Sequence, residues 1–543
     1  MKSFLEETRV IIHGNKAKMR KAMHTRRNTL FSVIIGLVAL PLLGQEVAMS
    51  EHLTLKDCIV RAIKYNLGVA VQVYSSELAD LTVAKSREIY LPILSFDFGK
   101  DSQNSASYYW TDAAGQNSTT AMNYSTSLSQ AIPFGGSISL TLGSFNYLTN
   151  ARFQMINPRY GSTLTFSFSQ PLLKGFGYAT SRKDILVARN TRDIVENDLK
   201  NNLIETVFSV EQAYWDLVYL NEFLKVKRQS LKLAEDLLDK NRKEADIGTL
   251  APKEVIGAQA EVASRRADIL QAVSKVKDST DTLKGLINLP LDKDIGDIVP
   301  ADTPGFVKWD ITLEEALVIG LKNRPELQSS TLEVKNKELD YSYAKNQMLP
   351  ALDLNAGYWS PGISGTRILY LDNNPLTGII VGTLPGGPSQ AMRDALHFKY
   401  KNWSVSLSLD IPMNSVFSRA AQAQAKTGLD QEIARMKQTE QNIYIGIRAA
   451  VRAVQTNYEC VGARRTAREL SEQKLEAEEA KLKVGLSENF KVLTYQRDLA
   501  EARRAELRAL IDYTLSLGQL DKAMGISLEK RNIKLTDALE VKY

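Results

Sequence analysis

The 543-residue chain has only two cysteines, Cys58 and Cys460, and only four histidines. Two cysteines cannot build a disulfide framework, so we expect both to be small buried residues. Beyond residues 1–44 only His52 and His397 remain, and no ligand spacing typical of a metal site is present. The sequence also lacks a Ser/His/Asp set and a nucleotide-binding loop. We therefore expect no catalytic residue, no metal, no cofactor and no enzyme activity.

The chain also has little net charge outside its first segment. The formal charge is +6, and residues 1–44 alone carry eight Lys/Arg and two acidic residues. Residues 45–543 are therefore close to neutral, which excludes an electrostatic case for a nucleic-acid partner.

Long apolar runs are equally scarce, and the exception lies in the same first segment. Residues 26–44, RRNTLFSVIIGLVALPLLG, are a basic stretch followed by an apolar run of about 15 residues. A spanning helix needs roughly 20 apolar residues, so we expect a secretory signal peptide over residues 1–44, with cleavage near Gly44. An uncleaved N-terminal anchor is the alternative.

The sequence contains an internal duplication. LTLKDCIVRAIKYNLGVAVQ at 53–72 aligns with ITLEEALVIGLKNRPELQSS at 311–330, and a later match pairs Gly248 with Gly485. A period of this length is far above that of solenoid repeats. We therefore expect two structural repeats with pseudo-two-fold symmetry, covering residues 45–300 and 301–543.

Each repeat begins with the same series of patterns. A helix of about 35 residues is expected at 55–90 and again at 313–348, each ended by a Leu-Pro pair. Alternating runs follow, which are LPILSFDFG at 91–99 and TLTFSFSQP at 163–171 in the first repeat, and LPALDLNAG at 349–357 and WSVSLSLDIP at 403–412 in the second. Alternation places apolar residues on one face of a strand and Ser/Thr residues on the other.

Four such strands cannot enclose a core of their own. The alternation is consistent with a membrane β-barrel, in which the apolar face meets lipid and the polar face meets water. A soluble sandwich is the alternative. Residues 123–143 read as an extra hairpin that could join the barrel or cap it, and residues 360–399 are rich in Gly and Pro and read as an external loop.

The largest predicted features are two helical hairpins. Residues 181–247 contain no proline or glycine, and leucine or valine recurs every seven residues, which is typical of coiled-coil packing. A glycine suits the position just beyond a helix end, so Gly248 and Gly485 should mark the tips. Hairpins are therefore expected at 181–289 and 418–524, followed by a C-terminal equatorial segment. Ser487 should cap a helix beginning at Glu488.

The layout resembles the TolC-like outer-membrane efflux and secretion channels, also called outer membrane factors. The resemblance lies in LTLKDCIVRAIKYN and ITLEEALVIGLKNRPEL, in SQPLLKG and LDIPMNS after the strands, and in VGLSENFKVLTYQRDLA at a tip. It implies an α+β membrane protein, a homotrimer that joins an α-helical barrel of coiled-coil hairpins to a twelve-stranded β-barrel in outer-membrane lipid, with four strands from each chain. The implied partners are a periplasmic adaptor protein and an inner-membrane pump of the RND or ABC type.

The resemblance also implies the site residues. In the family a Val-Gly-Leu-Ser/Thr tip docks the adaptor, which carries over to Val484, Gly485, Leu486 and Ser487, and more loosely to Ile247, Gly248 and Thr249. Acidic residues after the second family glycine often ring the closed tunnel entrance. The matching stretch here offers Glu488, Lys491 and Thr494, with Glu254 at the position in the first repeat that matches Lys491.

Glu254 and Lys491 could alternate around a trimer as salt bridges that hold the entrance shut, or they could be two solvated charges. On the first interpretation, reversing Lys491 to Glu should increase leakiness.

Taken together, these patterns predict a passive outer-membrane exit duct of a tripartite efflux pump or type I secretion system. The alternatives are a periplasmic adaptor or a structural coiled-coil spacer. An adaptor has one helical hairpin and lacks lipid-facing strands, and a spacer needs no strands at all. The cargo is not encoded in any pattern found in the sequence.

Overall fold

The computed structural model describes residues 52–113, 115–249, 251–290, 298–413, 416–484 and 486–536. The predicted signal peptide, residues 1–44, lies outside these residues. The first half contains β1 (His52–Leu53), α2 (Leu55–Tyr65), α3 (Leu67–Ser86), β2 (Ile93–Ala106), β3 (Gln116–Ala131), β4 (Ser137–Thr149), β5 (Ile156–Pro171), α4 (Tyr178–Ser181), α5 (Lys183–Asp246) and α6 (Pro252–Leu286). The second half contains β6 (Val299–Pro300), α7 (Leu313–Asn323), α8 (Pro325–Asn346), β7 (Ala351–Tyr370), β8 (Ile380–Leu384), α9 (Pro388–Leu396), β9 (Asn402–Asp410), α10 (Val416–Lys483), α11 (Asn489–Ala523) and α12 (Ser527–Lys530).

The first helix of each half is broken, so the prediction of single helices over 55–90 and 313–348 is wrong. Asn66 separates α2 from α3, because its side chain accepts hydrogen bonds from the backbone N–H groups of Gly68 and Val69 and caps a new helix. Pro325 opens α8, where its fixed φ suits the first helical position. Each half also starts with a capping box, Thr54 with Asp57 and Thr312 with Glu315.

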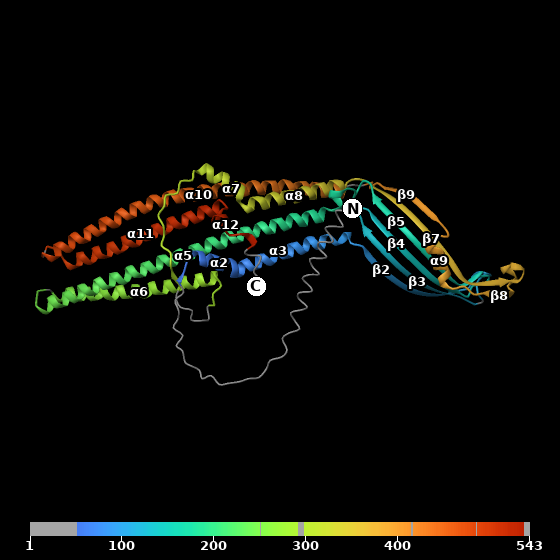
Figure 1. Ribbon diagram of the computed structural model, residues 1–543, viewed down its shortest axis with the longest axis horizontal. Helices are drawn as coiled ribbons and strands as arrows, with labels where there is room; N and C mark the ends of the chain where they lie inside the picture. Colours follow the sequence, from blue (N-terminus) through green and yellow to red (C-terminus); the bar gives the residue numbers. More distant parts are fainter. Residues whose placement is uncertain are drawn as a thin grey trace, which may run out of the picture. The chain divides into compact units, whose positions relative to one another are not determined.

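Both breaks contact the end of a returning helix. The Asn66 amide donates to the Leu286 carbonyl oxygen at the end of α6, at 2.8 Å. Arg324, beside the other break, donates to the Lys522 carbonyl oxygen near the end of α11, at 3.1 Å. These contacts fix where each hairpin returns to the middle of the helical region (Figure 1).

The long helices form the expected hairpins, α5 with α6 and α10 with α11. The seven-residue repeat of α5 lies inward: Leu203, Val210 and Leu217 are fully buried with α2 and α3 residues in one core. Further along, Leu238 belongs to a separate small core that includes Val262 of α6. The packing partner of α5 therefore changes along its length.

The strands form one antiparallel sheet in the order β2-β3-β4-β5-β7, and β7 pairs with both β8 and β9. The four predicted strands are present as β2, β5, β7 and β9. The uncertain segment 123–143 lies in β3 and β4, which pair with β2 and β5 along almost their whole length. This hairpin joins the sheet instead of capping it, so the chain contributes two long strands more than the four predicted.

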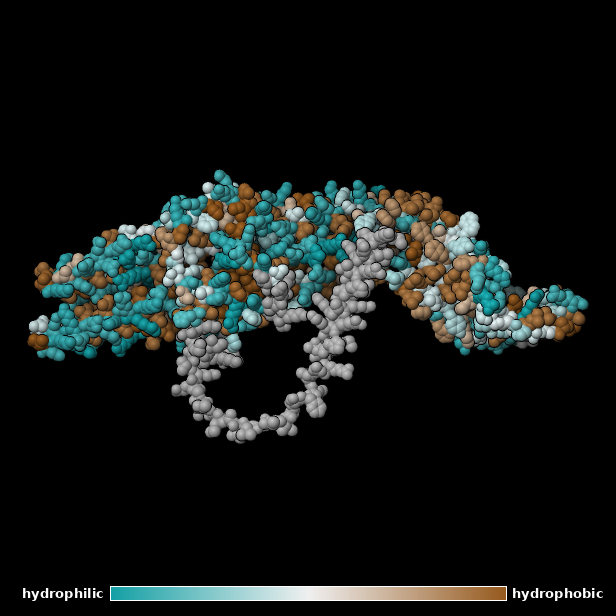
Figure 2. Space-filling view, viewed as in Figure 1, coloured by the Kyte–Doolittle hydropathy of each residue, from teal (hydrophilic) through white to brown (hydrophobic). Residues whose placement is uncertain are grey.

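One face of the sheet carries a row of apolar residues from edge to edge. The pairing registers place one apolar residue of each long strand in a continuous row: Leu94, Leu128, Leu140, Phe166, Tyr358 and Trp403. The neighbouring row on the opposite face starts with Ile93 in β2 and continues with small or polar residues in the other strands: Ser129, Ser139, Ser167, Gly357 and Ser404. Hydrophobic residues accordingly gather over the strands in Figure 2, whereas the helical tips are mostly hydrophilic.

The segment 360–399 is more ordered than the predicted external loop. β7 continues to Tyr370, and α9 folds back over β5 and β7. Gly362 allows this contact, because a Cβ there would lie 2.0 Å from the carbonyl oxygen of Ala391 in α9.

Over the residues that the structure describes, no helix is both long and apolar enough to cross a membrane.

Candidate functional site

The first hairpin tip is a tight backbone turn between α5 and α6. Gly248 has a φ of +84°, and the N–H of Thr249 donates to the Glu244 carbonyl oxygen at 2.9 Å. This pattern ends α5 in the left-handed conformation that favours glycine. Pro252 then starts α6. The turn leaves the Ile247 side chain 78% exposed at the tip.

The second tip joins α10 to α11, and its central residue, Gly485, lies outside the described residues. On either side of it, Val484 and Leu486 are exposed, and Leu486 is 78% exposed. The predicted capping role of Ser487 is wrong. α11 begins at Asn489 without a side-chain cap, and the Ser487 hydroxyl donates instead to Oε1 of Glu478, at 2.6 Å.

That hydroxyl changes the electrostatics of the second tip. The Ser487 hydrogen bond lowers the pKa of Glu478, and the nearby positive charges of Lys481 and Lys491 lower the pKa further. Lys491 therefore faces an acidic group of its own hairpin. Among the described residues of this chain, Glu254 and Lys491 form no ion pair, so a bridge between them would have to form between chains.

The two hairpins meet close to their tips. The buried side chains of Asn241 in α5 and Asn489 in α11 share a hydrogen bond of 3.0 Å. Beside it is a groove of about 170 Å³ whose lining includes Glu254 and Thr494. The structure thus brings these two predicted gate residues together, while Glu488 and Lys491 do not line this groove.

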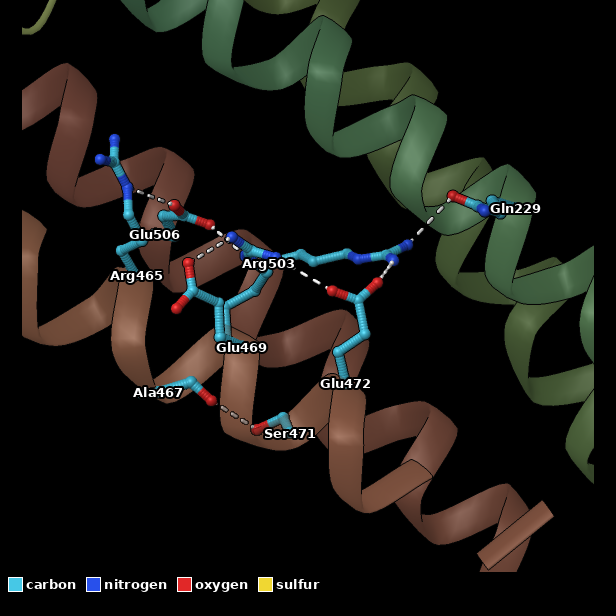
Figure 3. A network of polar contacts seen from close by, with 9 residues as sticks. Gln229, Arg465, Ala467, Glu469, Ser471, Glu472, Arg503 and Glu506 are labelled. Atoms are coloured by element: carbon cyan, nitrogen blue, oxygen red, sulfur yellow. Dashed lines mark hydrogen bonds and ion pairs between the residues drawn. The ribbon is translucent and has the colours of Figure 1, made fainter. Parts of the chain in front are cut away.

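Charged side chains tie the helices together farther from the tips (Figure 3). Arg468 pairs with Glu472 of its own helix at 3.0 Å and with Glu506 of α11 at 2.9 Å. Arg503 of α11 pairs with Glu472 at 2.9 Å and also donates to the Gln229 amide oxygen of α5, at 3.4 Å. Arg503, and then Arg468, lower the pKa of Glu472, so the Glu472 carboxylate stays ionised at neutral pH.

Other bonds continue the connection between the hairpins toward the middle of the helices. Arg508 of α11 pairs with Asp216 of α5 at 2.9 Å, and Lys522 pairs with Glu205 at 2.6 Å. The most buried pair is Arg531 with Glu211, where burial raises the pKa of Glu211 although Arg531 opposes that shift. Separating the hairpins would therefore break several charged contacts together.

Sequence reasoning did not find these inter-helix partners. The Asn241–Asn489 bridge joins residues 248 positions apart, and the Arg503 contact with Gln229 joins residues 274 positions apart. Neither pair falls in a recognisable motif.

If Lys491 belongs to the predicted tunnel-entrance gate, reversing its charge by Lys491→Glu is expected to increase leakiness. The new carboxylate would repel Glu478 and remove a positive charge from the second tip. Single-channel recordings in planar bilayers would show longer or more frequent openings. Lys483→Glu, an equal charge change at a nearby exposed residue, is the control, and unchanged recordings for Lys491→Glu would contradict the gate assignment.

Comparison with known proteins identifies the fold. Residues 317–526 match the family described as outer membrane efflux protein. The solved CmeC outer membrane channel of Campylobacter jejuni is similar, with 15% identity, a TM-score of 0.63, and coverage of 89% of this chain and 90% of that chain. VceC, an outer membrane protein of Vibrio cholerae, is similar with 14% identity, a TM-score of 0.62, and coverage of 87% of this chain and 96% of that chain.

The open state of the MtrE outer membrane channel of Neisseria gonorrhoeae has 18% identity and a TM-score of 0.60, covering 87% of this chain and 89% of that chain. No curated protein matches the chain in sequence. The resemblance to the TolC-like outer-membrane channels is therefore confirmed.

Proposed function

We propose that this chain, TolC-like in fold and matching the outer membrane efflux protein family over residues 317–526, is a passive outer-membrane exit duct. It would act as a homotrimer that carries substrates from an inner-membrane transporter across the periplasm and the outer membrane. The system would be a tripartite efflux pump or a type I secretion system. No chemical step is required of the chain itself, because the transporter would supply the energy.

One combination of features supports this proposal most strongly: a two-faced sheet and two long helical hairpins in a single chain. The apolar face of the sheet suits lipid, and the polar face suits a water-filled lumen. α5 has 64 residues, so the helix extends about 96 Å at 1.5 Å per residue. That length would let the hairpins reach deep into the periplasm from a sheet in the outer membrane.

The alternatives account for fewer of these features. A periplasmic adaptor has no use for an apolar sheet face that carries exposed Phe96, Phe166 and Leu407 side chains. A coiled-coil spacer leaves the whole sheet unexplained.

Membrane fractionation separates these alternatives. The proposed duct should be extracted from outer membranes only with detergent, and it should migrate as a trimer. Recovery of a soluble periplasmic monomer would contradict the proposal and favour an adaptor or spacer.

The exposed apolar residues at the tips are the proposed docking elements for the periplasmic adaptor. Ile247, Val484 and Leu486 are all well exposed in the chain, and the turns present them at the far ends of the hairpins. An adaptor hairpin could bury them between helices, as apolar anchors do in other interfaces. Gly248, Thr249, Gly485 and Ser487 would shape the turns that present them.

Leu486→Asp is expected to weaken adaptor binding. Burying a leucine contributes about 1.5–3 kcal/mol. Loss of Leu486 should therefore weaken adaptor binding about ten-fold or more at the second tip of each chain. Crosslinking in cells, followed by identification of the captured adaptor, measures the effect. Leu470→Asp, at an exposed leucine within α10 and away from the tip, is the matched control. Equal capture by both variants would place docking elsewhere.

A further inference from the structure

The β3–β4 hairpin is built into the sheet along its whole length. β3 pairs with β2 from Ile93 opposite Ser129 to Ala106 opposite Gln116. β4 pairs with β5 from Ser137 opposite Ser169 to Tyr147 opposite Arg159. A cap over a barrel would touch only one end of the strands, so this hairpin occupies a position in the wall.

We propose that each chain contributes six strands to the membrane barrel, so that three chains close a barrel of eighteen strands instead of twelve. The strands would be β2, β3, β4, β5, β7 and β9. This proposal rests on the trimeric duct proposed above and concerns the size and lining of its membrane pore.

The two faces of the hairpin match those of its neighbours. On the apolar face, Leu128 lies opposite Leu94 and Leu140, and Leu140 lies opposite Phe166. The rings of Phe98 and Tyr124 also pack there, with centroids 5.2 Å apart. β3 and β4 therefore carry the apolar row from β2 to β5 on this face, which also holds Thr126 and Ser144.

The polar face continues in the same way. The Ser125 hydroxyl donates to Asp97 of β2 at 2.9 Å, and the Ser127 and Thr141 hydroxyls are 3.0 Å apart across β3 and β4. These residues would line water in the lumen. Inserting two strands, and not one, also preserves the antiparallel order between β2 and β5.

The sheet edges indicate how the barrel closes. β2 and β9 are the outer long strands, and nearly all of their residues are exposed. An open edge in lipid would leave backbone groups unsatisfied at several kcal/mol each. β2 leads away from the helices and β9 leads back to them, so β2 of one copy can pair antiparallel with β9 of the next.

The wider wall would change the pore. Barrel diameter grows roughly linearly with strand number, so eighteen strands give a lumen about 1.5 times as wide as twelve. The added lumen surface would be rich in serine and threonine from β3 and β4. The outer-membrane section would then pass bulkier cargo than a twelve-stranded barrel.

Cysteine labelling tests the position of the hairpin. In a Cys58→Ala, Cys460→Ala background, single cysteines replace Ser127, Thr141, Leu128 and Leu140 of the reconstituted channel. A charged, water-soluble thiosulfonate should add its mass to Ser127→Cys and Thr141→Cys and leave Leu128→Cys and Leu140→Cys unmodified. Modification of all four, or of the leucine positions alone, overturns the proposal.

A deletion tests the strand number directly. Removing residues 116–149 leaves β2 and β5 joined by a loop, and both keep their directions. Cryo-EM of the trimer in nanodiscs should show a barrel narrower by about one third, whereas an unchanged diameter would exclude β3 and β4 from the wall. If the deletion variant does not assemble, the diameter of the unaltered trimer decides between eighteen and twelve strands.

These outcomes separate the two proposals. A chain that never enters the outer membrane as a trimer refutes the duct itself. An outer-membrane trimer whose barrel has the twelve-stranded diameter refutes only the six-strand wall.

Discussion

Replacing Phe166 with arginine is expected to prevent assembly of the proposed trimer in the outer membrane. Phe166 is 46% exposed on the apolar face of β5, between Leu140 and Tyr358 in the pairing register. An arginine facing lipid near the middle of the bilayer costs about 2–4 kcal/mol, and a trimer would contain three of them. The variant should disappear from outer-membrane fractions and from the trimer band on gels run without heating.

The next residue provides the control. Ser167 lies on the opposite face of the same strand, in register with Ser139 and Gly357. Ser167→Arg adds the same charge and bulk to the lumen side, so the trimer should assemble normally. If the two arginine variants assemble equally well, the apolar face does not meet lipid and the barrel assignment fails.

Leu217→Ala is expected to produce a large loss of stability. Leu217 is fully buried in the core that α5 shares with α2 and α3. Truncating a buried leucine to alanine costs about 2–5 kcal/mol, because it removes packed methyl groups and leaves a cavity. Thermal denaturation of the purified trimer, followed by helical circular dichroism, should show a clear fall in the midpoint.

Leu270→Ala in α6 removes the same atoms from a side chain that is 73% exposed. The midpoint of this variant should stay close to that of the unaltered protein. A fall as large as that of Leu217→Ala would mean that position 270 is covered in the assembled protein, and the packing argument for Leu217 would lose its control.

Structural features that are encoded by patterns repeating over many residues could be predicted from the sequence. The heptads of α5 predicted both the long hairpin and its buried side, since dozens of residues follow one rule. The breaks near Asn66 and Pro325 depend on single residues. Proline carried a signal that was available beforehand, whereas an asparagine inside a helical pattern does not reveal whether it will cap a new helix.

The sheet and the tips show a similar limit. β3 has serine or threonine on both faces, so its alternation was too weak to place it in the wall before the pairing registers were known. Ser487 has a residue type suited to a cap, but Glu478 lies close enough to accept its hydroxyl hydrogen. The tip residues themselves stay predictions, because their role depends on a partner and on other copies of the chain.

The alternation of the strands also bears on how such a chain can reach its destination. Because apolar and polar residues mostly alternate along the strands, no strand contains the roughly 20 consecutive apolar residues that a spanning helix needs. The strands therefore contain no segment that the export machinery would release into the inner membrane as a spanning helix. The apolar surface that includes Leu94, Leu128 and Phe166 forms only when the strands pair. Export of the extended chain is therefore compatible with later insertion of the folded sheet into a membrane.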